Sequence, residues 1–314
     1  MAYYTKITKK EFQKYIQNYS IGELSYFEGI DEGIENTNYF FKTKAQKYVL
    51  TIYENKITER IKQKNLSFFI ELINFLRKKN FPTPKIISNN KNKQLNTYKK
   101  KQFSIVEFID GKITKKINNQ HCYKLGKILA TLHKKTLGFK NKRKNDFSLK
   151  EWHALTKRIK LSKKGALFLK EEINYIKKNW PKNLPMGIIH GDLFPDNVFF
   201  KNNNIVGVID LSNACNDFFC YDLSICINAW CYKKNLDINK MKNLIKGYNS
   251  VRKLENNEIR NINFFLRVSS LRFYLSRLMD LQNKKIPKKY KKNPKDYLRK
   301  LKYFQSNNLK NIFK

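Results

Sequence analysis

The sequence predicts an α+β protein with a small lobe built on an antiparallel sheet and a larger, mainly helical lobe. Strand-like runs rich in β-branched and aromatic residues occupy 23–30, 37–43 and 46–54. After Gly111 the chain is dominated by helical periodicity, interrupted by a short strand–loop–strand segment at 186–210. Strands grouped before helices are typical of α+β proteins.

Chain length and hydropathy are compatible with such a two-lobed protein. The chain has 314 residues, of which 41% are hydrophobic, enough to form a sizeable core. It lacks an apolar run of about 18 residues, so we expect no membrane span. Its first residues lack the apolar stretch of a signal peptide, so we expect a cytoplasmic protein.

The net charge of +40, from 65 Lys and Arg against 25 Asp and Glu, leaves two interpretations open. A selected basic surface would bind a polyanion such as nucleic acid. A composition biased toward Lys, Asn and Ile would instead spread lysines along the whole chain, and this is the pattern seen. The second interpretation is favoured, so a nucleic-acid partner is not expected. Either way, the positive field attracts anionic ligands such as nucleotides.

The small lobe begins with a helix and a meander of strands. Thr8 and Glu11 have capping-box spacing, which predicts a helix from Lys9 to about Ile21-Gly22. The segment 31–38 contains glycine and two asparagines and suits a tight turn between the first two strands.

A second helix and another strand complete this lobe. Apolar residues at helical spacing predict a helix over 66–79, ended by the two prolines of 81–84. A strand is predicted at 103–109. The expected organisation is an N-terminal lobe, a short link and a helical C-terminal lobe, at 1–106, 107–112 and 113–314.

In the helical lobe, Leu125, Leu129 and Leu132 share one face of a predicted helix. Four of the five cysteines fall within 17 residues, between Cys215 and Cys231. Their spacing is not that of a zinc finger, and no histidine lies nearby. We therefore expect reduced, structural thiols.

The most informative stretch is IIHGDLFPDN, at 188–197. Asp192 and Asn197 lie five residues apart in a loop after a strand, and Asp210 ends another strand 13 residues later. A β-hairpin between them would bring Asp210 beside Asn197. Carboxylate and amide oxygens are ligands that Mg²⁺ accepts together with phosphate oxygens. Protein kinases use an Asp base, an Asn and a later Asp in this order.

The neighbouring polar residues have simpler explanations. His190 is expected to be a hydrogen-bonded core residue, and Asp196, after a proline, is expected to stabilise its turn.

HGDLFPDN followed by VIDLS resembles the phosphotransferase superfamily of aminoglycoside and choline kinases, in which glycine, here Gly191, follows the histidine. Five further blocks resemble the type II homoserine kinase family and follow one another in the same order over nearly the whole chain. They are GIENTNYF at 33–40, YVLTIYE at 48–54, ACNDFFCYDLSICINAWC at 214–231, GYNSVRKL at 247–254 and LRFYLSRLMD at 271–280.

The resemblance implies a bilobal, protein-kinase-like fold that binds ATP and Mg²⁺ between its lobes. It further implies ATP-dependent phosphorylation of the hydroxyl of L-homoserine, a step of threonine biosynthesis. By position, Asp192 is the catalytic base and Asn197 and Asp210 are the Mg²⁺ ligands. The implied nucleotide contacts are Gly33 and Asn36 or Thr37 at the phosphates, and the backbone of Glu107 to Ile109 at adenine.

One departure from protein kinases concerns the cation at the phosphates. Thr51 stands where their phosphate-binding lysine is expected, as in homoserine kinases in general. The glutamate that would pair with such a lysine is also unassigned, with Glu59 and Glu71 as the alternatives. Lys42 is one hypothesis for a substitute.

For the substrate, a carboxylate favours arginine, and Arg272 or Arg277 is available. Their offset of five residues places them on different faces of a helix. Asp217 or Asp222 is available for the ammonium, although Asp222 is expected to brace the catalytic loop.

Asn228 and Trp230 line the pocket in one interpretation and belong to the core in the other. Two alternative functions remain: a kinase of another alcohol (an amino sugar, a choline-like compound or an aminoglycoside) and a basic nucleic-acid-binding protein. The strongly basic composition disfavours an aminoglycoside, because a polycation requires an acidic pocket.

Overall fold

The structure is a computed structural model that describes residues 5–31, 36–54, 65–284, 286–307 and 309. The chain divides into two compact units, residues 1–110 and 111–314. Gly33 and Glu59, which the sequence singled out, lie outside the described residues.

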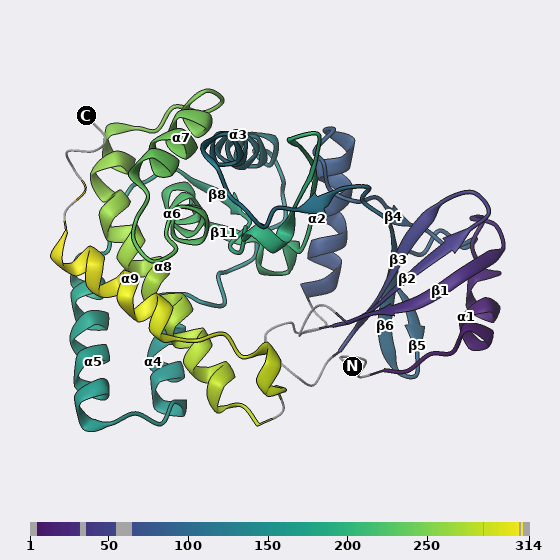
Figure 1. Ribbon diagram of the computed structural model, residues 1–314, viewed down its shortest axis with the longest axis horizontal. Coiled ribbons are helices and arrows are strands. Elements are labelled where there is room, and N and C mark those ends of the chain that lie inside the picture. The colour runs from purple at the N-terminus through teal and green to yellow at the C-terminus, as the bar shows by residue number, and fades with distance from the viewer. Residues whose placement is uncertain (1–4, 32–35, 55–64, 285, 308, 310–314) are drawn as a thin grey trace. The chain divides into compact units, whose positions relative to one another are not determined.

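The N-terminal unit contains an antiparallel sheet (Figure 1). Neighbouring strands follow the order β1 (Leu24–Ile30), β2 (Asn36–Thr43), β3 (Lys47–Tyr53), β6 (Lys101–Glu107) and β4 (Ile86–Ile87), and β5 (Asn96–Tyr98) also pairs with β6. The first three strands match the expected ranges to within one residue at each end. The two short strands β4 and β5 were not predicted.

One face of this sheet is covered by α1 (Lys9–Ile16), whose Phe12 packs 4.8 Å from Phe27 and 4.9 Å from Phe41 between ring centroids. The predicted capping box is present: the hydroxyl of Thr8 accepts from the N–H of Glu11 at 3.1 Å, and the Glu11 carboxylate accepts from the N–H of Thr8 at 2.8 Å. The helix ends earlier than predicted, because hydrogen bonds three residues apart replace the α-helical ones after Ile16.

The second helix, α2 (Leu66–Lys78), buries Leu72 and Leu76 completely. A Schellman motif ends it before the prolines are reached. Asn80 has a φ of 54°, and the N–H of Phe81 donates to the carbonyl of Leu76 at 3.0 Å.

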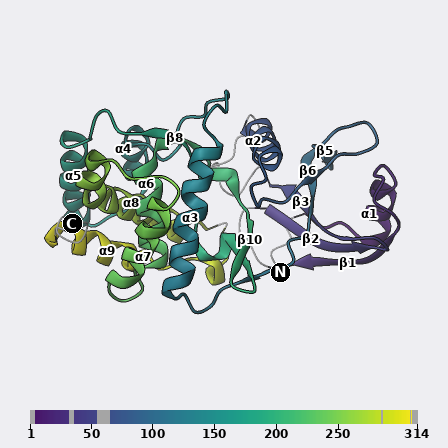
Figure 2. The same ribbon diagram turned by 90° about the horizontal axis from the view of Figure 1, so that it is seen from above.

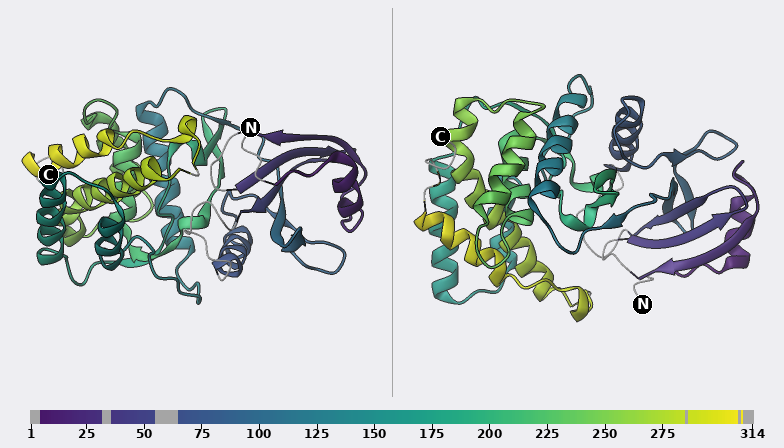
Figure 3. Two further views of the ribbon diagram at one scale, coloured as in Figure 1. Left: turned by 90° about the horizontal axis from the view of Figure 1, so that it is seen from below. Right: turned by 45° about the horizontal axis from the view of Figure 1, so that its top comes forward.

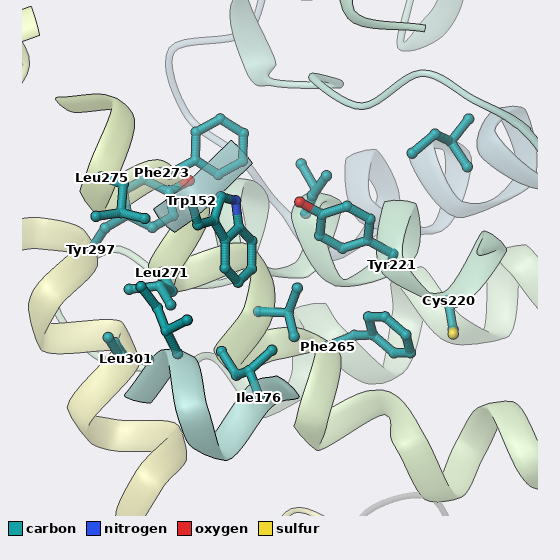
Figure 4. Packing of buried hydrophobic residues seen from close by; sticks show 14 of the residues in the cluster. Trp152, Ile176, Cys220, Tyr221, Phe265, Leu271, Phe273, Leu275, Tyr297 and Leu301 are labelled. Atoms are coloured by element: carbon teal, nitrogen blue, oxygen red, sulfur yellow. The ribbon is translucent and has the colours of Figure 1, made fainter. Parts of the chain in front are cut away.

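The C-terminal unit is built from seven longer helices within the described residues. They are α3 (Asn119–Lys135), α4 (Leu149–Arg158), α5 (Lys163–Lys178), α6 (Phe219–Trp230), α7 (Ile238–Asn249), α8 (Asn256–Gln282) and α9 (Lys295–Ser306). Every residue of α6 except Ala229 is buried, which is typical of a helix at the centre of a core. In Figure 4, Trp152, Tyr221 and Phe265 pack in this core, and α9 (yellow) runs along α8 in Figure 3.

Helices α3 and α7 lie side by side (Figure 2) with their backbones in contact. A Cβ added at Gly126 would lie 1.9 Å from the carbonyl oxygen of Leu244, and one at Gly247 would lie 1.9 Å from that of Tyr123. Glycine is therefore required on both sides of this crossing.

Two small sheets interrupt the helices. Strands β9 (Val198–Lys201) and β10 (Asn204–Val208) form the predicted hairpin, and β7 (Lys112–Ile113) joins it. Strand β8 (Met186–Ile189) pairs with β11 (Cys215–Phe218), which was not predicted.

All five cysteines are buried and free of disulfide bonds. No helix of the described residues is long and apolar enough to span a membrane.

Candidate active site

The loop between β8 and β9, residues 190–197, contains the predicted base Asp192, and we call it the catalytic loop. Its Asn197 donates from the side-chain nitrogen to the carbonyl of Asp192 at 2.8 Å, which fixes the amide so that its oxygen is the remaining acceptor. The carbonyl of Asn197 accepts from the N–H of Ile209 at 3.0 Å. Asp210 follows Ile209 directly, so the hairpin places Asn197 and Asp210 at one end, as predicted.

Asp192 is partly buried and receives a hydrogen bond from the side chain of Asn213 at 3.3 Å. Burial raises the pKa of its carboxyl, and the Asp210 carboxylate adds to this rise, whereas the Arg272 guanidinium opposes it. A carboxyl with a raised pKa is better suited to accept a proton from an alcohol.

Asp210 is exposed and adopts a left-handed backbone with a φ of 60°, a conformation that Asp tolerates better than most residues. One carboxylate oxygen accepts from the N–H and the hydroxyl of Ser212. No group of three His, Cys, Asp or Glu side chains among the described residues is placed to hold a metal ion. A divalent cation at this loop would therefore rely on Asn197, Asp210 and oxygens from a nucleotide, a donor set that fits Mg²⁺.

The buried side of the catalytic loop is held by Asp222 of α6, which is fully buried. Its carboxylate accepts from the N–H of His190 at 2.7 Å and of Gly191 at 2.9 Å, and it lies 3.1 Å from Nε2 of His133. Burial alone would raise the pKa of Asp222, but the hydrogen bond from His133 and the backbone N–H groups hold it below its usual value. These contacts are the bracing role that the sequence favoured, and they engage both oxygens of the Asp222 carboxylate.

A chain of hydrogen bonds continues from Asp222 into the helices. Nδ1 of His133 lies 2.7 Å from the hydroxyl of Tyr248, and Arg252 donates to that hydroxyl at 3.2 Å. Arg252 also forms a bidentate ion pair with Glu258, with N–O distances of 3.0 and 2.9 Å. Burial lowers the pKa of His133, so a neutral ring donates from Nε2 to the carboxylate. The sequence did not reveal this support, because His133 follows the apolar face of α3 like any core residue.

Gly191 has a φ of 74°, and a Cβ there would lie 2.9 Å from the carbonyl oxygen of Asn213. Glycine is required for both reasons. Beside it, Nδ1 of His190 accepts from the N–H of Asp192 at 3.3 Å, so its Nε2 donates to the carbonyl of Ile209 at 3.0 Å. His190 thus ties the loop to the end of β10.

Trp230 and Asn228 belong to the core rather than to a pocket. Trp230 donates to the carbonyl of Leu193 at 2.8 Å, which adds another support for the catalytic loop. Asn228 is fully buried and donates to Leu266 and Ser269 of α8 at 3.1 and 2.7 Å.

The two candidate arginines of α8 have different surroundings. Arg272 is 4% exposed, with its guanidinium 4.5 Å from the ring of Phe147 and 4.4 Å from that of Phe273. It donates to the carbonyl of Gly191, and its Nε has no hydrogen-bond partner among the described residues. Arg272 therefore lies directly against the catalytic loop.

Arg277, one turn and a half further along α8, contacts the segment before α9. It donates to the carbonyl of Asn293 at 2.8 Å and lies 3.2 Å from the Asp296 carboxylate. Its guanidinium is thereby occupied in holding this segment.

Asp217, at the end of β11, is partly buried. Its carboxylate accepts from the side chain of Asn145 at 2.7 Å and from the N–H of Phe218 at 2.8 Å. Burial raises the pKa of Asp217, while these hydrogen bonds and the charge of Arg272 oppose the rise. Arg272 is thus electrostatically coupled to both Asp192 and Asp217.

In the N-terminal unit, the side-chain oxygen of Asn36 accepts from the N–H of Glu54 at 3.3 Å. The neighbouring Thr37 is fully buried, and its hydroxyl donates to the Glu54 carboxylate at 2.7 Å. Thr51, at the position of the missing lysine, donates to the side chain of Asn38 at 2.9 Å.

The expected adenine-binding backbone starts at the end of β6. The N–H of Glu107 donates to Lys85 at 3.0 Å, and that of Phe108 donates to Lys47 at 3.0 Å. An adenine contact through these residues would therefore use carbonyl groups or the N–H of Ile109.

Together, the antiparallel sheet, the helical unit and the Asp–Asn–Asp trio on a strand–loop–strand frame define a phosphotransferase with a protein-kinase-like fold. Solved structures with similar folds include an amicoumacin kinase bound to AMP-PNP and Ca²⁺, with a TM-score of 0.74, 15% identity and coverage of 96% of this chain and 92% of that one. A choline kinase from Streptococcus pneumoniae has a TM-score of 0.67 and 16% identity, with coverage of 95% and 99%. At these identities the likeness shows the fold alone.

Sequence comparison is more specific. The model of the phosphotransferase enzyme family matches residues 27–253. The homoserine kinase of Rhizobium meliloti is 37% identical, over 98% of this chain and 95% of that protein. The homoserine kinase of Parvibaculum lavamentivorans is 38% identical, over 96% of each. The chain therefore belongs to the phosphotransferase enzyme family, in the branch whose curated members are homoserine kinases. Membership of this kinase family implies ATP as the phosphoryl donor.

Proposed function

We propose that this enzyme transfers the γ-phosphoryl group of ATP to the hydroxyl of L-homoserine, forming O-phospho-L-homoserine and ADP. The observation that supports this most strongly is the trio of Asp192, Asn197 and Asp210, assembled on one loop and hairpin in a chain whose full-length relatives are homoserine kinases.

In the proposed reaction, Asp192 accepts the proton of the substrate hydroxyl. The hydroxyl oxygen forms a bond to the γ-phosphorus as the bond from that phosphorus to the bridging oxygen of ADP breaks. The hydrogen bond from Asn213 orients the Asp192 carboxylate, and Asp222 holds the backbone from which it extends. Phosphoryl transfer depends mainly on such positioning and on charge stabilisation.

Asn197 and Asp210 are the proposed Mg²⁺ ligands, because an amide oxygen and an exposed carboxylate at one hairpin end fit that ion. When bound, Mg²⁺ neutralises charge on the phosphate oxygens of the nucleotide.

For the substrate, we assign the carboxylate to Arg272 rather than to Arg277. Arg272 lies against the catalytic loop, and its buried Nε–H has no partner among the described residues, whereas Arg277 is engaged with Asn293 and Asp296. Asp217 is the proposed partner of the ammonium, because its partly buried carboxylate lies near Arg272. Opposite charges on the protein would thus match the two ends of a zwitterionic amino acid.

For the nucleotide, the proposed adenine contacts are carbonyl groups of Glu107 to Ile109 and the N–H of Ile109. At the phosphates, Gly33 remains a prediction. Asn36 is the preferred side-chain donor there, because the hydroxyl of Thr37 is buried against Glu54.

The test is an assay of ADP release with Mg²⁺-ATP across homoserine, serine, threonine, choline and kanamycin. We expect turnover with homoserine alone and a fall in kcat of about 1,000-fold or more in Asp192→Asn, because the base is lost. Turnover of another of these alcohols in place of homoserine would overturn the substrate and retain the chemistry.

A further inference from the structure

Thr51 stands where protein kinases carry their phosphate-binding lysine, and Lys42 is poorly placed to replace it. On β2, Asn38 pairs with Thr51, whereas Lys42 pairs with Lys47 four residues further along. That offset is about 13 Å along a strand. The ammonium of Lys42 instead lies over the rings of Tyr26 and Phe40 at 5.3 and 5.8 Å.

A different cation lies against the catalytic loop itself. Nζ of Lys292, in the segment before α9, is 3.5 Å from the Asp196 carboxylate and 5.7 Å from the centroid of the Phe194 ring. Asp196 and Phe194 both belong to the catalytic loop.

The backbone around Lys292 is held independently of that ion pair. Arg277 donates to the carbonyl of Asn293 at 2.8 Å, and Lys291 donates to the carbonyl of Leu281 at 2.9 Å. Pro294 is buried, and α9 begins directly after it. The segment thus presents Lys292 to the loop whether or not Asp196 is paired.

The ion pair itself is easily exchanged. The side chains of Lys292 and Asp196 are 56% and 57% exposed, and such exposed pairs contribute little to stability. An ammonium in this position can leave Asp196 for a stronger anion at little cost.

From this geometry we propose that Lys292 binds the phosphoryl group during its transfer and stabilises the charge on its oxygens. This role rests on the proposed kinase reaction and adds a catalytic residue to it. The bonds that form and break are those given above, with the proton passing to Asp192, and Lys292 takes no part in the proton transfer. Groups directed at charge that develops in a transition state are among the most effective in catalysis.

The experiment compares Lys292→Met with Lys288→Met, which removes the same charge from an exposed position in the same segment. We expect kcat to fall on the order of 100-fold in Lys292→Met, with KM for ATP and for homoserine within about threefold. Lys288→Met should retain kcat within about twofold. Lys292→Arg should recover part of the loss, because the charge is kept.

A second measurement does not depend on turnover. Binding of ADP with Mg²⁺ and aluminium fluoride, which imitates the transferring phosphoryl group, is compared with binding of AMP-PNP by calorimetry. We expect Lys292→Met to bind the fluoride complex on the order of 100-fold more weakly and AMP-PNP almost unchanged. Equal effects on both ligands would overturn the proposal.

Asp196→Asn separates catalysis from a structural ion pair. If Lys292 acts on the phosphoryl group, Asp196→Asn keeps kcat within about twofold. Equal losses in Asp196→Asn, Lys292→Met and the double variant would overturn the proposal, because the ion pair would then be what matters. A raised KM for homoserine with unchanged kcat in Lys292→Met would overturn it too, by assigning the lysine to the substrate carboxylate.

Assays of the wild-type enzyme separate a failure of the Lys292 proposal from a failure of the proposed function. Wild-type turnover of homoserine with an unimpaired Lys292→Met variant overturns the role of Lys292 alone. Wild-type turnover of another alcohol overturns the substrate alone, and the comparison of variants is then made with that alcohol.

Discussion

The two sides of the catalytic loop hold charged residues in opposite environments. On the inner side, the fully buried carboxylate of Asp222 accepts the N–H groups of His190 and Gly191. On the outer side, Asp196 and Lys292 form an ion pair in which each side chain is more than half exposed. Removing a partner of the buried inner charge should destabilise the protein strongly. The outer ion pair is screened by solvent and contributes little to stability, so it can exchange its partner for a ligand.

Removal of the buried Asp222 carboxylate should lower the stability of the protein more than any other change considered. Asp222→Ala leaves the N–H groups of His190 and Gly191 buried without an acceptor and removes the acceptor of the His133 Nε2 hydrogen bond. We expect the free energy of unfolding to fall by about 3–5 kcal/mol, measured by urea denaturation. The matched variant Asp196→Ala removes the same group from the outer side and should cost about 1 kcal/mol or less.

Asp222→Asn provides an intermediate step, because the amide retains one acceptor oxygen but cannot receive all three N–H groups. A loss of stability in Asp196→Ala as large as that in Asp222→Ala would show that the contrast between the two sides is wrong.

Gly191 lies in the backbone of the catalytic loop, and replacing it should have the next largest effect on stability. Gly191→Ala combines a φ of 74° with a Cβ 2.9 Å from the carbonyl oxygen of Asn213. Gly138 has a φ of 85°, but a Cβ there meets no atom within 4 Å. We expect Gly191→Ala to cost about 2–4 kcal/mol and Gly138→Ala about 1–2 kcal/mol, so that their difference measures the steric contact.

The two variants should also differ in activity. Gly191→Ala displaces the residue next to Asp192 and should lower kcat, whereas Gly138→Ala should leave kcat unchanged. Equal losses of stability in urea denaturation would contradict a steric role for Asn213.

The sequence predicted the elements that local patterns determine. The capping box of Thr8 and Glu11, the three strands of the N-terminal meander and the hairpin that joins Asn197 to Asp210 depend on residues close in the chain. The strand β11 was missed because its four residues pair with β8, a partner about 30 residues away. Its extended conformation depends on that pairing rather than on an apolar pattern in its own sequence.

Spacing in the sequence predicted candidate catalytic and metal-binding residues. It gave no sign of the residues that support them through packing. Asp192, Asn197 and Asp210 were predicted from their spacing, and the structure places Asn197 and Asp210 at one end of the hairpin. The support from His133 and Trp230 and the position of Lys292 depend on contacts between segments far apart in the chain, and such contacts have no local signature. The two arginines of α8 show the same limit, because helical spacing separated their faces but did not identify which face meets the loop.

A second lysine, Lys300, is buried where Lys292 is exposed, and it allows the contrast between buried and exposed charges to be tested again. Lys300 of α9 is 6% exposed and donates to the carbonyl of Asn228 near the end of α6, beside the ring of Tyr297 at 4.4 Å. Burial, with a contribution from the charge of Arg277, lowers the pKa of Lys300 from 10.5 to about 7. Lys292, in contrast, is solvated.

Between pH 7 and 10.5, an unfolded chain keeps the proton on Lys300 while the folded protein releases it. The unfolded state then binds more protons, so stability should rise with pH, by at most about 1.4 kcal/mol per pH unit. In Lys300→Met this rise should disappear, whereas Lys302→Met, an exposed neighbour on α9, should keep it. Urea denaturation at pH 7.5, 8.5 and 9.5 measures the three slopes. Equal slopes in the wild type and Lys300→Met would mean that the buried ammonium is stabilised as well as a solvated one. Burial alone would then not distinguish the two lysines, and the contrast between inner and outer charges would have to rest on hydrogen-bond partners.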